Sequence, residues 1–397
     1  TDGGIGIGNI AQASVSLKLS ASVGSDNFKA FGTEVVYIPE GQFYIGDGGT
    51  VNNHYAFSDA QGSDIYAPLL ITQAIQNAGL GAKTVYQRQS YGSSGDLSST
   101  FPLGYNAFYI MKYEINQAQY VDFLNSLTVQ QQLEIMGDLK NSRPPNSATG
   151  TVMKSYNSSV RIEIVTPGDN TSSYTPAIYG LDASNDNNFN QDNDGFGIPV
   201  TLNRRELLTY LDWTALRPMT EFEYEKACRG PLTPVMYEKA WGTTSYTNKH
   251  GNPTNYRSSN SYFRTDWDNY LGPNHNVIVR SGIDATSTSN RERSGATFFG
   301  VMEMTGNIGE FAIGGRDGNY STFTNAPGDG SISQIAENDS PNWKSQGYIY
   351  RGRGNWNWGN GAERVSNRYG DWKGEINSNY NQDKNVYAIG GRGVRSW

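Results

Sequence analysis

The chain has 397 residues and a net charge of -7, and this acidic balance excludes the basic surface that nucleic-acid-binding proteins need. Its 26 Tyr and 8 Trp exclude an intrinsically disordered chain, because disordered chains contain few aromatic residues. The sequence has no run near the roughly 18 apolar residues of a membrane span. Scarce Lys beside abundant Tyr, Asn and Gly favours an extracellular or cell-surface protein.

Residues 1–30 are expected to form an extended N-terminal segment outside the main domain. Within it, Val15, Leu17 and Leu19 alternate with polar residues, which is the period of a half-buried β-strand. A single strand needs the edge of a sheet with which to pair. The sequence leaves two arrangements open, since the strand could fold back on its own domain or add to a neighbouring subunit as an assembly strand.

The remaining chain has the pattern of a folded domain, interrupted by polar insertions near residues 47–104 and 141–200. Residues 35–46 predict two short strands around a Pro-Glu-Gly turn, and residues 108–115 predict a strand that leads into a helix. Beyond residue 240 the sequence predicts short strands and long loops. These elements together favour the α+β class.

Two helix starts are indicated by capping boxes, in which a polar side chain and a residue three positions later cap each other's backbone N–H groups. Asn116 and Gln119 form one such pattern, and Thr220 and Glu223 form the other. Cys228, the single cysteine, lies in the apolar stripe of the second helix. We therefore expect a buried thiol that packs as a small hydrophobic group, and no internal disulfide.

The stretch Gly300–Phe311 places two carboxylates, Glu303 and Glu310, around a tight Gly-Asn turn in an apolar frame. A carboxylate among apolar residues needs a partner, because an unpaired buried charge is costly. With backbone carbonyl groups freed by the turn, the two side chains could form an oxygen cage for calcium. A turn with two solvated glutamates is the alternative.

A second candidate for calcium is the loop Asn190–Gly195, which has oxygen ligands at alternate positions before a Gly, like the start of an EF-hand. The twelfth position of that pattern is Thr201 and not Glu, so the bidentate ligand is missing. The sequence favours an Asn/Asp-rich surface loop, with a weak extracellular calcium site as the alternative.

Taken in chain order, these segments resemble the formylglycine-generating enzyme (sulfatase-modifying factor) family, which has a C-type lectin-like fold. The resemblance implies a single elaborated α+β domain at residues 31–397, with few helices, short strands and many long loops. The counterparts of the family motifs are Ile38–Gly46, Glu114–Phe123, Arg217–Gly230, Gly300–Phe311, Arg351–Asn355 and Gly393–Arg395.

The resemblance also implies a structural calcium ion. Its ligands would be the side chains of Glu303 and Glu310 and the backbone carbonyl groups of Gly306 and Ile308. The family's enzymes oxidise a substrate with a cysteine pair and copper, but the segment after Arg351 that should carry this pair has no thiol. A copper(I) site needs soft sulfur ligands, so we expect no such enzyme activity.

Residues 350–372 interleave Trp and Tyr with Arg, the residue types that dominate binding hot spots. Trp356, Asn357, Trp358 and Tyr369 are the candidate ligand-binding residues, and carbohydrate is a candidate ligand because aromatic faces suit sugars. The alternative for several aromatic residues of this segment is a place in the core strands that the resemblance implies.

We therefore expect a non-catalytic extracellular or cell-surface protein that uses its domain for assembly or ligand binding. Its partners would be copies of itself, as in a filament or lattice joined by the N-terminal strand, or other surface proteins. A retroelement-diversified receptor of the same fold is an alternative, and a component of a gliding or secretion apparatus is another.

Overall fold

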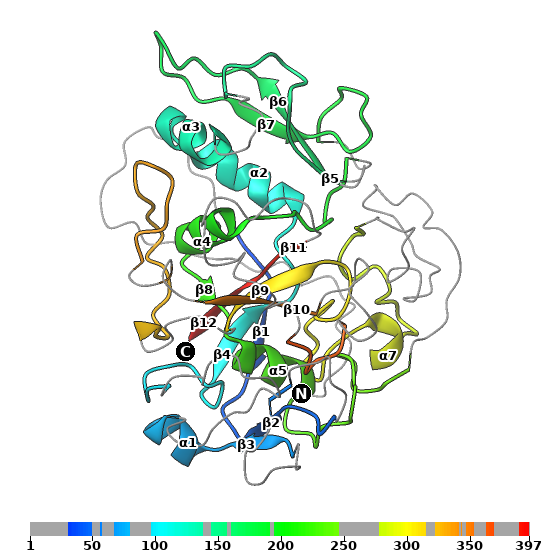
Figure 1. Cartoon of the computed structure of the whole chain (residues 1–397). Coiled ribbons are helices and arrows are strands. Elements are labelled where there is room, and N and C mark those ends of the chain that lie inside the picture. Colours follow the sequence, from blue (N-terminus) through cyan, green and yellow to red (C-terminus); the bar gives the residue numbers. More distant parts are fainter. Residues whose placement is uncertain are drawn as a thin grey trace, which may run out of the picture.

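The computed structural model describes residues 31–49, 56–57, 67–79, 97–137, 144–156, 160–190, 194–245, 278–314, 322–340, 343, 347–352, 363–368 and 389–396. In these residues the fold is mixed α+β, with few helices and short strands, as the sequence predicts (Figure 1). The helices are α1 (Gln73–Ala78), α2 (Gln117–Ser126), α3 (Val129–Gly137), α4 (Arg204–Trp213), α5 (Glu221–Arg229) and α7 (Arg291–Ser294). The strands are β1 (Val35–Ile38), β2 (Phe43–Ile45), β3 (Leu69–Ile71), β4 (Phe108–Met111), β5 (Val152–Tyr156), β6 (Val160–Thr166), β7 (Ile178–Leu181), β8 (Arg217–Pro218), β9 (Gly309–Ile313), β10 (Tyr348–Arg351), β11 (Ile389–Gly390) and β12 (Gly393–Ser396).

The central sheet has the strand order β1-β4-β12-β8 and is antiparallel throughout. It brings the first described strand of the chain close to the last one. A three-stranded sheet lies beside it, in which β9 pairs antiparallel with β10 and parallel with β11 (Figure 1). The strands predicted at residues 35–46 are β1 and β2, and the strand predicted after residue 107 is β4, so these predictions are confirmed.

Both predicted capping boxes are present. The Asn116 and Gln119 pair starts α2, and the Thr220 and Glu223 pair starts α5, with side-chain to backbone hydrogen bonds in both directions. Each such cap stabilises its helix by about 1 kcal/mol, because it satisfies N–H groups that the helix leaves unpaired. Across the described residues, no helix is long and apolar enough to cross a membrane.

The two predicted insertions contain regular structure. Residues 67–79 supply β3, which pairs with β2, and the short helix α1. Residues 152–181 form the antiparallel sheet β5-β6-β7, which packs against α2 at the top of Figure 1. The Asn125 side chain of α2 fixes this contact, because its amide donates to the Tyr179 carbonyl and its oxygen accepts from the Tyr179 N–H. The second insertion is therefore anchored to the rest of the protein.

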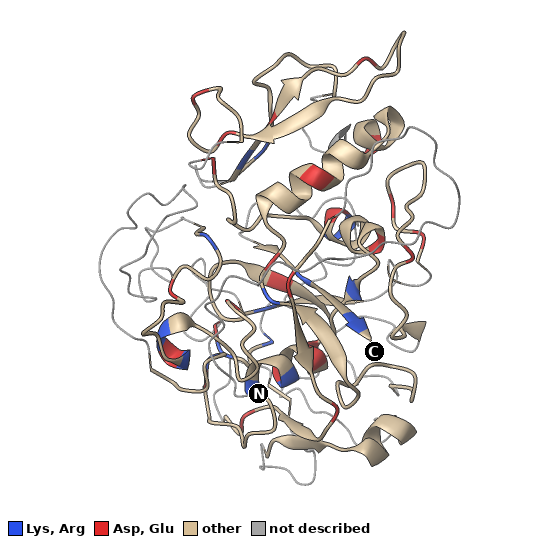
Figure 2. Cartoon of the chain, turned by 180° about the vertical axis from the view of Figure 1, so that it is seen from behind, with Lys and Arg blue, Asp and Glu red and all other residues tan. Residues whose placement is uncertain are grey.

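Helix α5 is buried along its whole length and packs against β2, β9 and β10. Its Phe222 ring lies 5.0 Å from Phe57 and 6.0 Å from Phe101, measured between ring centroids. Cys228 is fully buried on the same helix, so the predicted packing thiol is confirmed. Three acidic residues and then two basic ones lie along α5 (Figure 2), so this core helix carries five charged side chains.

Candidate functional site

The predicted calcium ligand Glu310 lies on β9 and has a cationic partner from the protein itself. Arg392, which follows β11, donates to both of its carboxylate oxygens, at 2.6 and 2.9 Å. Both side chains are fully buried. The same guanidinium also donates to the backbone carbonyl groups of Met111, Lys112 and Met302. The structure thus compensates the charge of Glu310 with an arginine.

Glu303, the second predicted calcium ligand, keeps one carboxylate oxygen without a hydrogen-bond donor. Its Oε1 accepts from the Gly282 N–H at 2.7 Å, while its buried Oε2 has no hydrogen-bond partner. Burial raises the pKa of Glu303 to about 7. Glu114 lies in the same group, 3.8 Å from Arg392, and burial raises its pKa well above the ordinary value. Three buried carboxylates therefore surround one guanidinium, which leaves negative charge for a proton or a metal cation to neutralise.

Gly306 and Ile308, whose carbonyl groups were expected to bind calcium, belong to a tightly held turn. The Gly306 N–H donates to the Gly352 carbonyl at 2.8 Å. Asn307 between them has a positive φ of 54°, and its side-chain amide pairs with both backbone groups of Val279. The calcium ion at this stretch stays a prediction. It fits Glu303, which has an orphan oxygen, better than Glu310, which Arg392 already binds.

A network of buried ion pairs runs through α5. Glu221 binds Arg351 at 3.0 Å and binds Arg368 through two hydrogen bonds of 2.6 and 2.7 Å. One turn later, Glu225 binds Arg351 and Arg229, each at 2.7 Å. Burial opposes the ionised form of Glu225, but these two arginines outweigh it and hold the pKa of Glu225 below its ordinary value. We call Glu221, Arg351 and Arg368 the ionic clamp.

The ionic clamp fixes the chain at the edges of the predicted ligand-binding segment. Arg351 ends β10 just before residues 353–362, and Arg368 stands directly before residues 369–388. The four predicted ligand-binding residues lie in these two ranges and therefore outside the described residues; they are Trp356, Asn357, Trp358 and Tyr369. The predicted assembly strand with Val15, Leu17 and Leu19 also lies outside them.

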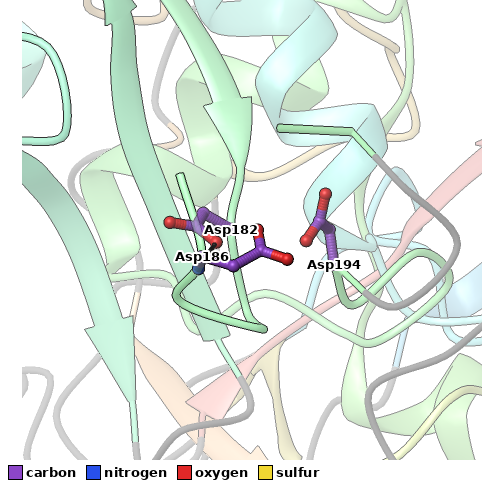
Figure 3. Close-up of side chains that lie close together, drawn as sticks. All are labelled: Asp182, Asp186 and Asp194. Atoms are coloured by element: carbon purple, nitrogen blue, oxygen red, sulfur yellow. Dashed lines mark hydrogen bonds between the residues drawn. The ribbon is translucent and has the colours of Figure 1, made fainter. Parts of the chain in front are cut away.

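Two groups of acidic side chains in the described part of the chain have a spacing that suits a metal ion. In each group the carboxylate oxygens lie within 4.8 Å of one another. One group is Asp182, Asp186 and Asp194, and Figure 3 shows the Asp186 carboxylate between the other two. The sequence pattern of an EF-hand indicated only Asp194 of this group. Its other members come from the turn after β7, which no sequence pattern indicated.

The second acidic group joins loops through hydrogen bonds. Asp212, near the end of α4, accepts hydrogen bonds from the N–H groups of Asp329 and Asp339 and from the Ser340 hydroxyl, at 3.3, 2.9 and 3.0 Å. The oxygens of Asp212 thus have protein donors, and this carboxylate holds residues 329–340 against α4. The arrangement explains the proximity of these acidic residues without a metal ion.

No family model matches the chain, and no curated protein matches it. Among solved structures it is similar to Treponema denticola variable protein 1, with 11% identity, coverage of 91% of this chain and 95% of that chain, and a TM-score of 0.33. It is also similar to the M1 and U1 variants of the Major Tropism Determinant, with 11% identity, coverage of 90% of this chain and 72% of those chains, and TM-scores of 0.26. TM-scores of this size do not establish a shared fold. The resemblance to formylglycine-generating enzymes rests on the sequence motifs.

Proposed function

We propose that this protein is a non-catalytic extracellular or cell-surface protein that binds a ligand, with carbohydrate as the favoured class. The six motifs in chain order support a C-type lectin-like domain of the formylglycine-generating enzyme type. The observation that carries the proposal is the ionic clamp. Through Glu221 it ties Arg351 and Arg368, which stand before the aromatic-containing segments 353–362 and 369–388, to one buried helix.

Rigid attachment of a binding segment matters for affinity. A ligand that binds a loop must order it, which costs conformational entropy. This entropic cost is smaller when the ends of the loop are already fixed. For this reason binding residues are commonly found on loops that a rigid scaffold positions. The clamp is such a support, because Glu221 makes three hydrogen bonds to two arginines and is almost completely buried.

The chemistry of the described residues supports binding over catalysis. Burial raises the pKa of the Cys228 thiol to about 12, so the only cysteine is not a thiolate nucleophile at neutral pH. Each carboxylate of α5 is paired with a buried arginine: Glu221 with Arg351 and Arg368, Glu223 with Arg217, and Glu225 with Arg229 and Arg351. The sequence places aromatic residues of the sugar-binding type in the two segments next to the clamp.

A glycan array probed with the purified full-length protein tests the proposal. We expect binding to a defined set of glycans, and we expect the double variant Trp356→Ala and Trp358→Ala to lose it. Tyr174→Ala is the matched control, because Tyr174 is an aromatic residue with 67% exposure on the β6-β7 connection. Unchanged binding by the double variant would contradict the proposed location. A protein that binds no glycan would contradict the ligand class.

A role in assembly is the second candidate, and the edge of the central sheet favours it. Strand β1 stands at the end of the described strand order, and its Val35 and Tyr37 side chains are 41% and 49% exposed. An edge strand of this kind can accept another strand. Deletion of residues 1–30 should then leave a folded protein of smaller oligomeric state in multi-angle light scattering. An unchanged molar mass would exclude assembly through the N-terminal strand.

A further inference from the structure

The sheet β5-β6-β7 places two carboxylates on one face. Glu163 of β6 stands opposite Gly180 of β7, and Asp182 follows two residues later. Because side chains alternate along a strand, Asp182 and Glu163 point to the same face as diagonal neighbours. The Asp182 N–H donates to the Arg161 carbonyl at 3.2 Å, which continues the pairing as far as Asp182. Both carboxylates are fully buried.

The chain then folds back over this face and adds two more carboxylates. The return is fixed at Leu181, whose N–H donates to the Asn190 side chain and whose carbonyl accepts from the Asn190 N–H, both at 3.1 Å. Gly180 permits the close approach, because a Cβ there would lie 2.6 Å from Val165 and 3.2 Å from Phe189. As a result, the oxygens of Asp186 and Asp194 come within 4.8 Å of Asp182.

A separate observation at Glu163 indicates a missing positive partner. Its Oε1 is bound by Arg161, but its Oε2 is buried and has no hydrogen-bond donor. This oxygen lies 3.9 Å from the point where a Gly150 Cβ would stand, and the Asn187 Oδ1 of the returning loop lies 3.0 Å from the same point.

We propose that a calcium ion binds at this place, with Asp182, Asp186 and Asp194 as ligands and Glu163 as the fourth carboxylate. Calcium prefers hard oxygen ligands, six to eight in number, and tolerates irregular geometry. The four carboxylates supply the oxygens, and Arg161 offsets only one of their negative charges. The ion holds the returning loop on the sheet. This site is separate from the stretch around Glu303 and does not depend on the proposed function.

A protonated Glu163 beside the Asp182 carboxylate is the alternative to a metal ion, because it would also relieve their repulsion. Such a pair would not respond to calcium at neutral pH. Protein donors reach two of the carboxylates without supplying a full positive charge. The Ser184 hydroxyl donates to Asp194 at 2.9 Å and to Asp182 at 3.4 Å, and the N–H groups of Asp186 and Asn187 donate to Asp182 at 3.0 and 3.3 Å. Calcium binding measured directly therefore separates the two explanations.

The test is isothermal titration of calcium chloride into the full-length, chelator-treated protein. We expect a dissociation constant on the order of 10⁻⁴–10⁻³ M, the range of extracellular modules. Asp194→Asn keeps the acceptor for Ser184 and removes one charge, so it should weaken binding at least tenfold. Asp339→Asn in the second acidic group is the matched control and should leave the affinity unchanged. Glu303→Gln should also leave this site unchanged, which separates it from the calcium predicted at residues 303–310.

Asp186→Asn provides a second variant whose folding is not in question, because Asp186 is exposed. It should also weaken calcium binding about tenfold or more. Circular dichroism in EDTA verifies that each variant is folded like the natural protein. Absence of calcium binding would overturn the proposal, and so would binding that both Asp194→Asn and Asp186→Asn leave unchanged. An equal loss in the Asp339→Asn control would overturn the location.

Discussion

The buried pair of Glu310 and Arg392 leads to a quantitative prediction about stability. Glu310→Gln keeps the shape of the side chain and removes its charge, which leaves Glu114 at 3.8 Å as the closest remaining carboxylate of this group. Removing one partner of a buried ion pair costs about 3–5 kcal/mol. Here Glu114, at 3.8 Å, is beyond hydrogen-bond distance and does not replace the two charge-assisted hydrogen bonds that Glu310 accepts from Arg392. Both side chains are fully buried and share two short hydrogen bonds. We therefore expect the free energy of unfolding to fall by about 3–5 kcal/mol.

Urea unfolding followed by Trp fluorescence measures this loss. The experiment is run at pH 7 in EDTA, so that no bound calcium contributes to stability. Glu34→Gln is the matched control, because Glu34 forms an ion pair of 2.7 Å with Lys112 but is 44% exposed. An exposed pair contributes about 0–1 kcal/mol, so the control should lose little. A loss in Glu310→Gln no larger than in the control would refute the reasoning.

Three further predictions concern pH, the ionic clamp and the thiol. Because the folded-state pKa of Glu303 is about 7 against an ordinary 4.5, its contribution to stability is complete below pH 4.5 and is lost as the pH rises through 7. In EDTA the free energy of unfolding should fall by about 3 kcal/mol over this pH range, and the fall should be absent in Glu303→Gln. If the unfolding free energies of the natural protein and Glu303→Gln changed in parallel with pH, the prediction would be wrong. Glu221→Gln should lower the free energy of unfolding, measured in urea, by about 3–5 kcal/mol. It should also increase tryptic cleavage after Arg368, because the ionic clamp would no longer hold this residue. Unaltered cleavage would show that the clamp does not restrain the chain there. Cys228 should react with Ellman's reagent at pH 8 only after unfolding, and rapid labelling of the folded protein would contradict its burial.

Helix starts were predictable from the sequence because their determinants are local. Asn116 and Thr220 each find a capping partner three residues along the chain, and both caps are present. Helix α4 was not predicted, although it begins with the same pattern at Asn203 and Glu206. The signal was available there, since an apolar stripe with Leu207 and Leu211 follows the cap.

The partner of Glu310 was not predictable from local pattern. The sequence shows that two carboxylates stand in an apolar stretch and need positive charge, and this part of the reasoning is physically sound. Arg392 lies 82 residues further along the chain, and long-range strand pairing, including that of β9 with β11, brings it to Glu310. Local sequence therefore indicated the need for a cation but not which cation meets it.

The acidic group at the β7 turn shows a related limit. An EF-hand pattern requires its ligands within one continuous loop, and Asn190 fits that pattern by residue type. In the structure the Asn190 side chain accepts a hydrogen bond from Leu181 and closes the returning loop. Asp194 meets Asp182 and Asp186 because of that closure. The distances between these carboxylates depend on a loop that folds back over the β5-β6-β7 sheet. A search for the EF-hand pattern does not detect such an arrangement, because that pattern describes ligands in one continuous loop.

The position of β12 also determines when this protein can fold. The last described strand lies inside the central sheet between β4 and β8, and Arg392 just before it bonds to Met111, 281 residues earlier. During synthesis the sheet therefore lacks the strand between β4 and β8 until residues 393–396 have been made. Contacts so distant in sequence form slowly, since loop closure must precede them. We therefore expect the central sheet to form late, only after β12 has been synthesised.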